Sequence, residues 1–388
     1  MNAERPSAGF PPLVEPGPEL PPELVERYRR QITLPHIGAV GQRRIRSASV
    51  LVIGAGGLGS PVVHYLAGCG VGSLTIVDDD AVDLSNLHRQ VIHGVDTLGE
   101  PKAESAARAV ARLDPSIRVQ PVNARVSAEN VLDLVQGHDV IVDGSDNFAT
   151  RYLVADASEI TGVPVVWGAV LRRSGHVSVF WPGRGAHYRD VFPEPPGPAE
   201  APSCAQAGVL GTLPGVIGTV MATQVLLLVT GTGSPLIGRL LVWDEATSTS
   251  RTLLTAPDPT RTPAAEIGPF PGSALCTAGA PGPQETVDPA ALREILDAAA
   301  AGGPVPVLVD VREPWECAAG ALPGSVNVPL HTVLEHGVGA LPAGDEVVLY
   351  CQGGVRSAQA LAALRPAWTD REGRLRHLAG GYEGWQRG

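Results

Sequence analysis

The stretch from Val50 to Asp80 constrains the fold of this chain more than any other part of the sequence. An apolar run, VLVI, leads directly into the glycine-rich turn GAGGLG at residues 54–59, and apolar residues then recur at helical spacing. A second apolar run ends in three aspartates. This order predicts a strand, a tight turn, a helix and a second strand, as in a nucleotide-binding βαβ unit. Glycines let the backbone approach a phosphate, and a helix N-terminus attracts negative charge, so the turn predicts an anion site without naming the anion.

Length and composition predict two α/β domains. The chain has 388 residues, of which 44% are hydrophobic and only 4% aromatic, a balance typical of proteins with a parallel sheet. Helical patterns over residues 102–113 and 289–300 and a strand pattern over 346–350 agree with this class. Proline and glycine are dense over residues 1–22, where we expect a disordered leader, and over 256–284, where we expect a linker. The expected domains therefore cover residues 23–255 and 285–388.

The net charge of −11 and the pI near 5.4 argue against nucleic acid or an anionic membrane as a partner. The longest apolar stretch, near Val216–Val229, contains Gly218 and Thr219, and we interpret it as too short and too polar to span a bilayer. The five cysteines form no C-x-x-C pair, which favours neither a disulfide framework nor a zinc cage. These features predict a cytoplasmic enzyme.

Polar residues that follow the expected strands predict the chemistry of the first domain. Asp78 ends a strand about twenty residues beyond the glycines, where an acid accepts hydrogen bonds from ribose hydroxyls. Cations after it would bind a polyphosphate, and a carboxylate at a later strand end could hold Mg²⁺. The candidates are Ser85, Asn86, Arg89, Lys102, Asp146 and Asn147.

Two other classes of function stay open at this point. An NAD-dependent oxidoreductase on the same Rossmann-like fold would share the glycine turn, but it would bind NAD and need no ATP. A catalytically dead scaffold would keep the fold without using the polar residues. The coincidence of Arg30, Arg89, Lys102 and Asp146 in one chain counts against the scaffold.

Five motifs together resemble the MoeB/ThiF family of ubiquitin-activating-enzyme-like adenylyltransferases. They are RYRRQ at residues 27–31, the GAGGLG turn, DDDAVDLSNLHRQ at 78–90, GEPK at 99–102 and SDN at 145–147, and the resemblance covers residues 20–254. It implies a Rossmann-like domain of the ubiquitin-activating-enzyme type. It also implies that ATP and Mg²⁺ are used to adenylate the C-terminal glycine of a ubiquitin-fold sulfur carrier protein ending in Gly-Gly.

The same resemblance implies roles for the matching residues. Asp146 would bind Mg²⁺, and Arg30 matches the arginine that such dimers insert into the partner's site, so a homodimer is expected. Because a carrier carboxylate attacks another anion during adenylation, the cations would offset their repulsion. The nucleotide-binding residues would be Gly54, Gly56, Gly57, Asp78, Ser85, Asn86, Arg89, Lys102, Asp146 and Asn147.

The chain departs from this family at a zinc site. Many members have one C-x-x-C pair before a mobile loop and another near the end, whereas this chain has His187-Tyr188-Arg189-Asp190 and no cysteine pair after Trp243. These departures count against a structural zinc. His187 and Asp190 could in principle ligate a metal, but two residues make no closed site, and we expect both at the surface. This variation resembles the actinobacterial MoeZ type.

Cys204, in PSCAQAGVLG, matches the family's loop cysteine, which bonds to the carrier in some members. It precedes a glycine-bearing helix start that could stabilise a thiolate, so we expect Cys204 to be reactive. The alternative is a small, half-buried thiol without a chemical role.

Two motifs near the C-terminus resemble a small α/β rhodanese domain: DVREPWECAAGALPGSVNVP at residues 310–329 and YCQGGVRS at 350–357. The second motif places Cys351 at the tip of a strand and Arg356 at the start of a helix. Backbone N–H groups and Arg356 would together stabilise a persulfide anion on Cys351. Four residues separate Cys351 from Arg356, one fewer than in the related phosphatases, which favours sulfur.

Both motif sets on one chain predict an adenylyltransferase that is also a sulfurtransferase. The carrier's glycine carboxylate would become an acyl-adenylate, and a persulfide on Cys351 would displace AMP. Cys204 would then release the thiocarboxylate. Molybdopterin biosynthesis is one of the pathways that such a thiocarboxylate could supply with sulfur. The sulfur donor would be thiosulfate or a cysteine desulfurase.

Overall fold

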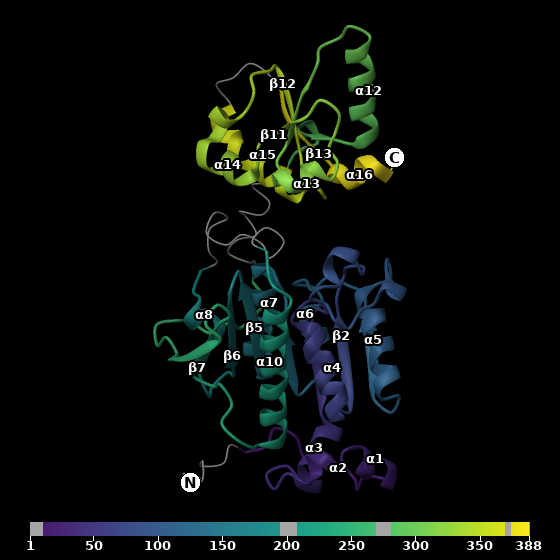
Figure 1. Ribbon diagram of the computed structural model, residues 1–388. Helices are drawn as coiled ribbons and strands as arrows, with labels where there is room; N and C mark the ends of the chain where they lie inside the picture. The colour runs from purple at the N-terminus through teal and green to yellow at the C-terminus, as the bar shows by residue number, and fades with distance from the viewer. Residues whose placement is uncertain (1–10, 195–207, 269–280, 369–373, 388) are drawn as a thin grey trace. The chain divides into compact units, whose positions relative to one another are not determined.

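The computed structural model describes residues 11–194, 208–268, 281–368 and 374–387. The chain forms two compact units, residues 1–271 and 272–388, and the division falls inside the stretch expected as a linker. Each unit consists of one sheet with helices packed on it, so the predicted α/β class is confirmed (Figure 1).

The first unit is built on a mostly parallel, eight-stranded sheet. Its strands are β1 Ser49–Ile53, β2 Ser73–Val77, β3 Arg118–Val122, β4 Val140–Asp143, β5 Val165–Leu171, β6 Ser174–Phe180, β7 Arg239–Asp244 and β8 Thr249–Leu254. Across the sheet their order is β3-β2-β1-β4-β5-β6-β7-β8, with antiparallel pairing from β5 onward. The chain moves outward from β1 to β2 and later returns to β4 on the other side of β1. Ligands of open α/β sheets bind at such a reversal, beyond the carboxyl ends of the strands.

Helices cover both faces of this sheet (Figure 1). They are α1 Pro22–Arg27, α2 Arg29–Ile32, α3 Gly38–Ser47, α4 Gly59–Cys69, α5 Lys102–Leu113, α6 Val131–Val135, α7 Phe148–Thr161, α8 Tyr188–Val191 and α10 Thr212–Thr230, with the 3-10 helices η1 Leu84–Asn86 and η2 Val95–Thr97. Val50 and Val52 of β1 share one core with α4 and α10, whereas Leu51 and Ile53 share the other with α6 and α7. Because both faces are buried, the strands are continuous apolar runs.

The glycine-rich turn after β1 requires glycine at two positions. Gly54 has a φ of +89°, in the left-handed region that side chains disfavour. A Cβ on Gly59 would lie 1.8 Å from the carbonyl oxygen of Gly54. The start of α4 therefore packs directly on the end of β1, and its N-terminus faces the edge of the sheet.

Two stretches expected to be irregular contribute to the first unit. Val14, in the expected leader, is 7% exposed within the core, and the N–H of Leu13 donates to the carbonyl of Leu228 on α10. Ile267, in the expected linker, packs against the core on the other face of the sheet, and Arg261 forms ion pairs there. The expectation of disorder is therefore wrong at Val14, and Arg261 and Ile267 pack on the first unit although they lie in the expected linker. Isolated contacts of this kind leave no periodic pattern in the sequence.

α10 has the length and apolar composition of a membrane-spanning helix, with a mean hydropathy of 1.8. The interpretation of this stretch as too short and too polar is therefore wrong. However, 56% of its most apolar window is buried inside the unit, where the helix contacts α4, β5 and β6. The core that it forms with the sheet accounts for its composition.

The second unit is a five-stranded parallel sheet with the order β11-β10-β12-β13-β9. Its strands are β9 Thr286–Val287, β10 Val307–Asp310, β11 Val326–Asn327, β12 Glu346–Tyr350 and β13 Arg374–Leu378. Its helices are α12 Pro289–Ala300, α13 Pro314–Ala318, α14 Leu330–His336, α15 Val355–Trp368 and α16 Gly381–Arg387, with the 3-10 helices η3 Pro283–Glu285 and η4 Gly337–Ala340. Because β10 and β12 are neighbours, the residues that follow them meet at one edge of the sheet.

Candidate active site

A pocket opens in the first unit where β1 and β4 end. It is lined by the glycine turn, the end of β2, the start of α5 and the loop after β4. Residues that lie as far apart in the sequence as Gly54 and Pro214 therefore meet at this edge. The predicted nucleotide-binding residues that line it are Gly54, Gly56, Gly57, Asp78, Arg89, Lys102 and Asp146.

Asp78 holds the glycine turn against the end of β2. Its Oδ2 accepts a hydrogen bond from the N–H of Ala55 at 2.7 Å, and its Oδ1 accepts one from the N–H of Asp80 at 2.9 Å. Burial raises the pKa of Asp78 above the usual aspartate value, and the nearby Lys102 partly offsets that effect. Each carboxylate oxygen keeps a second lone pair that could accept a ribose hydroxyl.

Lys102 and Arg89 supply positive charge to the pocket. Lys102 is 5% exposed, and its Nζ donates to Oδ2 of Asp80 at 2.7 Å. Asp80, which the sequence did not indicate as a site residue, is mostly exposed, so a bound polyphosphate can replace it as the partner of Lys102. Arg89 donates to Oδ1 of Asn86 at 2.7 Å, which makes Asn86 the residue that orients the arginine.

His93 is a further residue of the site that the sequence did not indicate. Its Nε2 lies 2.9 Å from the carbonyl oxygen of Ala55, which can only accept, so Nε2 bears the hydrogen. Its Nδ1 lies 2.9 Å from Oγ of Ser105, on α5. Burial lowers the pKa of His93 and keeps the ring neutral. His93 thus connects the glycine turn to the helix that begins with Lys102.

The turn after β4 is held from two sides. The buried Asp143 accepts hydrogen bonds from the N–H and Oγ of Ser145 at 3.0 and 2.6 Å, and burial raises the pKa of Asp143. Arg151, one turn into α7, donates two hydrogen bonds to the carbonyl of Ser145 at 3.3 and 3.0 Å. Arg151 also lines the pocket and was missed from the sequence, although it follows SDN closely. These contacts fix the position of Asp146.

Asp146 fits the predicted Mg²⁺ because its exposed carboxylate lines the pocket and Mg²⁺ prefers oxygen ligands. Asn147, the next residue, caps α7: its Oδ1 accepts a hydrogen bond from the N–H of Thr150 at 2.9 Å. Carboxylates of the DDD run at 78–80, two of which line the same pocket, lie within 4.8 Å of one another and could also hold a cation.

Two predicted residues lie away from the pocket, and a third is not among the residues that the structure describes. Ser85 donates from its N–H and its Oγ to Oδ1 of Asp83 at 2.8 and 2.5 Å, at the start of η1. Arg30 is exposed on α2, where an arginine can reach a neighbouring chain. Cys204 lies outside the described residues.

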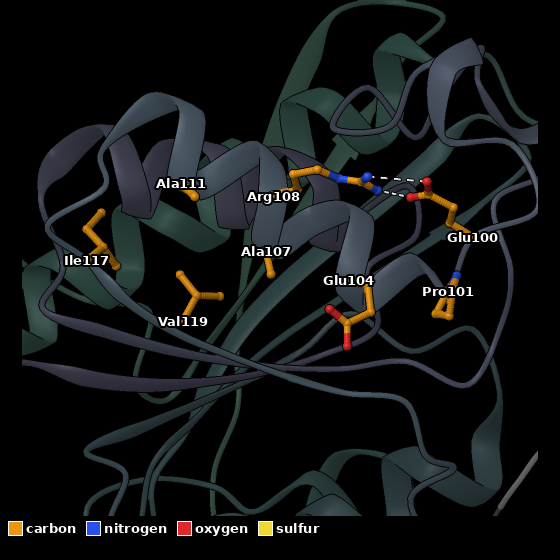
Figure 2. Close-up of a pocket in the computed structure, with 8 residues that line it drawn as sticks. All are labelled: Glu100, Pro101, Glu104, Ala107, Arg108, Ala111, Ile117 and Val119. Atoms are coloured by element: carbon orange, nitrogen blue, oxygen red, sulfur yellow. Dashed lines mark hydrogen bonds and ion pairs between the residues drawn. The ribbon is translucent and has the colours of Figure 1, made fainter.

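A second groove, of about 600 Å³, lies beside α5 and is lined also by residues at the start of β3; Figure 2 shows its lining residues. Its apolar lining includes Ala107, Ile117 and Val119, and two of its three charged residues, Arg108 and Glu100, pair with each other. The groove lining contains none of the candidate residues that the structure describes, and we assign the groove no part in the chemistry.

His187 and Asp190 are buried, so their expected surface positions are wrong. The exposed fraction is 3% for His187 and 2% for the Asp190 side chain. The Nε2–H of His187 donates to the carbonyl of Ala155 at 2.9 Å, and its Nδ1 accepts from the N–H of Arg189 at 3.2 Å. Both ring nitrogens are therefore in use, and the imidazole has no lone pair left for a metal.

The second unit places Cys351 directly after β12. Cys351 is 1% exposed, and its Sγ accepts a hydrogen bond from the N–H of Gly354 at 3.1 Å. The carbonyls of Cys351 and Gln352 accept from the N–H groups of Tyr382 and Glu383 at 2.8 and 3.0 Å, at the start of α16. The carbonyls of Cys351 and Gln352 are thus bound to α16, and the N–H of Gly354 points at the sulfur. A backbone N–H in this orientation can stabilise the negative charge of a persulfide.

Arg312, which the sequence did not indicate as a site residue, fixes this loop from the end of β10. It is 2% exposed and makes three hydrogen bonds of 2.7–3.1 Å to Asp310. Its Nη1 also donates to Oε1 of Gln352 at 2.9 Å, and its guanidinium stacks 4.5 Å from the ring centre of Tyr382. The DVR run of the first rhodanese-like motif contained this arginine.

Arg356 and Cys317, which lie near the Cys351 loop, each contact a carboxylate. Arg356, at the start of α15 as predicted, is paired with Glu316 of α13. The Sγ of Cys317 donates to Oδ2 of Asp310 at 3.1 Å. Burial and the Asp310 carboxylate raise the pKa of Cys317 to about 11, so this thiol is a weak nucleophile at neutral pH.

Known proteins match both units. The ThiF family matches residues 28–264, and the rhodanese-like domain matches residues 289–388. The chain is 43% identical to the probable adenylyltransferase/sulfurtransferase MoeZ of Mycobacterium tuberculosis (strain ATCC 25618 / H37Rv), over 98% of this chain and 97% of that protein. It is 39% identical to the adenylyltransferase and sulfurtransferase MOCS3 of Mus musculus, over 84% of this chain and 73% of that protein. The SAMP-activating enzyme E1 of Haloferax volcanii is 48% identical, over 59% of this chain and 84% of that protein.

Solved structures share the fold of the first unit. MccB of E. coli, crystallised with ATP, superposes with a TM-score of 0.54 at 17% identity, over 61% of this chain and 73% of MccB. PaaA superposes with a TM-score of 0.54 at 21% identity, over 62% of this chain and 76% of PaaA. At such identities the likeness supports the fold alone. The two family models and the relatives that match nearly the whole chain identify the family. This chain belongs to the ThiF family, among the members that end in a rhodanese-like domain.

Proposed function

We propose that this chain adenylates the C-terminal glycine of a ubiquitin-fold sulfur carrier protein and then converts that carboxylate into a thiocarboxylate. The observation that supports this most is one pocket lined by the turn glycines, Arg89, Lys102 and Asp146, on the same chain as the Cys351 loop. An NAD-dependent oxidoreductase has no use for that cysteine loop. The relatives MoeZ and MOCS3 combine the same two activities in their names.

In the first step, the carrier carboxylate attacks the α-phosphorus of ATP and pyrophosphate leaves. Both reactants are anions, so Arg89, Lys102 and Arg151 at the pocket would offset their repulsion. Asp146 would hold Mg²⁺, which supplies further positive charge at the phosphates when bound. In a homodimer, the exposed Arg30 of one copy would add a cation to the pocket of the other.

In the second step, sulfur reaches the acyl-adenylate through Cys351. Its persulfide, loaded from thiosulfate or by a cysteine desulfurase, attacks the acyl carbon and AMP leaves. Cys204 then attacks the Cys351 sulfur of the acyl disulfide, the thiocarboxylate leaves, and a disulfide between the two cysteines remains. A thiol reductant must reopen that disulfide, which suits the reducing cytoplasm.

Carrier-dependent exchange of labelled pyrophosphate into ATP tests the adenylation step. The full chain is incubated with ATP, Mg²⁺ and a purified sulfur carrier that ends in Gly-Gly, and a carrier truncated by those two residues is the control. Exchange is expected with the intact carrier alone, because the terminal carboxylate must fit the pocket. Binding of NAD in place of ATP would favour the oxidoreductase, and ATP binding without exchange with any Gly-Gly carrier would favour the scaffold.

A further inference from the structure

Arg261 joins two elements of the first unit to the segment that follows β8. Its Nη1 and Nη2 donate to the two carboxylate oxygens of Glu159, on α7, at 2.8 and 2.6 Å. Its Nε donates to Oδ1 of Asp190, on α8, at 2.5 Å. The exposed fractions of these side chains are 18% for Arg261, 10% for Glu159 and 2% for Asp190. The guanidinium therefore lies between two buried carboxylates, and we call these three residues the Arg261 cluster.

The two carboxylates also hold the backbone on either side of the cluster. Oε2 of Glu159 accepts a hydrogen bond from the N–H of Ala264 at 2.8 Å. Oδ2 of Asp190 accepts one from the N–H of His187 at 2.7 Å. All four carboxylate oxygens consequently have a donor, which is the condition under which buried charges are tolerated.

A second ion pair supports the cluster from the same helix. Arg189, next to Asp190, donates to both oxygens of Asp156 at 2.7 and 2.8 Å, and its guanidinium lies 4.6 Å from the ring centre of Tyr152. Asp156 precedes Glu159 by one turn of α7. α8 is thus attached to α7 at two successive turns.

The zinc that the family resemblance implies does not fit these residues. In that family the metal joins a C-x-x-C pair at the position of residues 187–190 to a second pair near the end of the domain. Here residues 187–190 are joined to the segment after β8 through Arg261, and no cysteine lies at residues 187–190 or 261–264. Both nitrogens of His187 are in use, and a cationic guanidinium occupies the space between the carboxylates. A second cation at this point would be repelled.

We infer that Arg261 replaces the structural zinc of other family members. The guanidinium supplies the positive charge and the directional bonds that lock α8 and the segment after β8 onto α7. This chain consequently needs neither a metal nor reduced cysteine thiols to hold that part of the first unit together.

Metal analysis of the full chain tests whether the first unit is held together without zinc. Protein purified without chelators and examined by inductively coupled plasma mass spectrometry should contain zinc far below one equivalent. Treatment with 1,10-phenanthroline should leave the melting temperature unchanged. One tightly held zinc per chain whose removal lowers the melting temperature would overturn the inference.

Variants of Arg261 test whether its guanidinium locks α8 and the segment after β8 onto α7. Arg261→Ala leaves the Glu159 and Asp190 carboxylates without the guanidinium that neutralises them, and it should lower the melting temperature of the first unit by roughly 6–20 °C. Arg173→Ala is the matched control, because it breaks one ion pair of 3.6 Å in which Arg173 is 68% exposed, and it should shift the melting temperature by less than about 2 °C. Equal shifts in the two variants would contradict the inference.

Arg261→Lys keeps the claim testable where the alanine variant fails to fold. Lysine retains the charge but not the planar fork, so its melting temperature should lie between those of the wild type and Arg261→Ala. Added zinc should rescue neither variant. Full stability of Arg261→Lys, or rescue of either variant by zinc, would overturn the assignment of this role to the guanidinium.

Discussion

Arg356, at the start of α15, donates two hydrogen bonds of 2.6 Å to the carboxylate of Glu316 on α13. The arginine expected to assist the persulfide is therefore already paired with a carboxylate. Arg312, a second guanidinium at the loop, is paired in the same way with Asp310. The Cys351 loop consequently offers an incoming anionic donor little positive charge beyond its backbone N–H groups.

Glu316→Gln should release the charge of Arg356 toward the loop. Thiosulfate is an anion, so its KM in the thiosulfate–cyanide assay should fall by at least about threefold. Glu313→Gln is the control, because Glu313 lies on the same segment with 43% of its side chain exposed. A KM for thiosulfate that is unchanged or higher in Glu316→Gln would show that the pairing does not limit donor binding.

Lys102→Ala should remove the ammonium group that pairs with Asp80 at the nucleotide pocket. The rate of ATP–pyrophosphate exchange should fall by about 10²–10³-fold, the usual cost of losing one preorganised charge-stabilising donor. Arg108→Ala, on the same helix but in the groove of Figure 2, should change the rate by less than about twofold. Similar losses in both variants would mean that α5 was disturbed as a whole.

ATP binding should depend on the protonation of Asp78. The pKa of Asp78 is raised, so the carboxylate takes up a proton at a higher pH than an ordinary aspartate. The ribose contact is complete above that pKa and is lost as the pH falls through it. Calorimetric Kd values for a non-hydrolysable ATP analogue should therefore rise more steeply toward acid pH in the wild type than in Asp78→Asn. Parallel curves would exclude Asp78 as the titrating group.

The features that the sequence predicted correctly depend on residues that are close to one another along the chain. α5 and α12 have the predicted bounds, since helical periodicity and composition are local. The glycine turn and the Cys351 loop were also evident, because each joins a strand end to a helix start within a few residues. The topology then brings Lys102 and Asp146 to the turn, as strands of a parallel sheet all end at one edge.

The features that the sequence did not reveal depend on contacts between distant positions. Arg261 lies 102 residues from Glu159, and its surroundings are composed like a linker. His93 meets Ala55 across 38 residues, and Arg312 reaches Gln352 across 40. A lone charged or imidazole side chain gives no periodic signal, so its partner appears only when the chain is folded.

Cys351 is proposed to deliver sulfur to a carboxylate that is activated at the first site. The most direct measurement is intact-mass spectrometry of the carrier after incubation with the full chain, ATP, cysteine and a cysteine desulfurase. Cys351→Ser should keep carrier-dependent ATP–pyrophosphate exchange but yield no thiocarboxylate, whereas Cys317→Ser, which changes a neighbouring thiol, should yield it normally. Thiocarboxylate formed by Cys351→Ser at the wild-type rate would contradict the account.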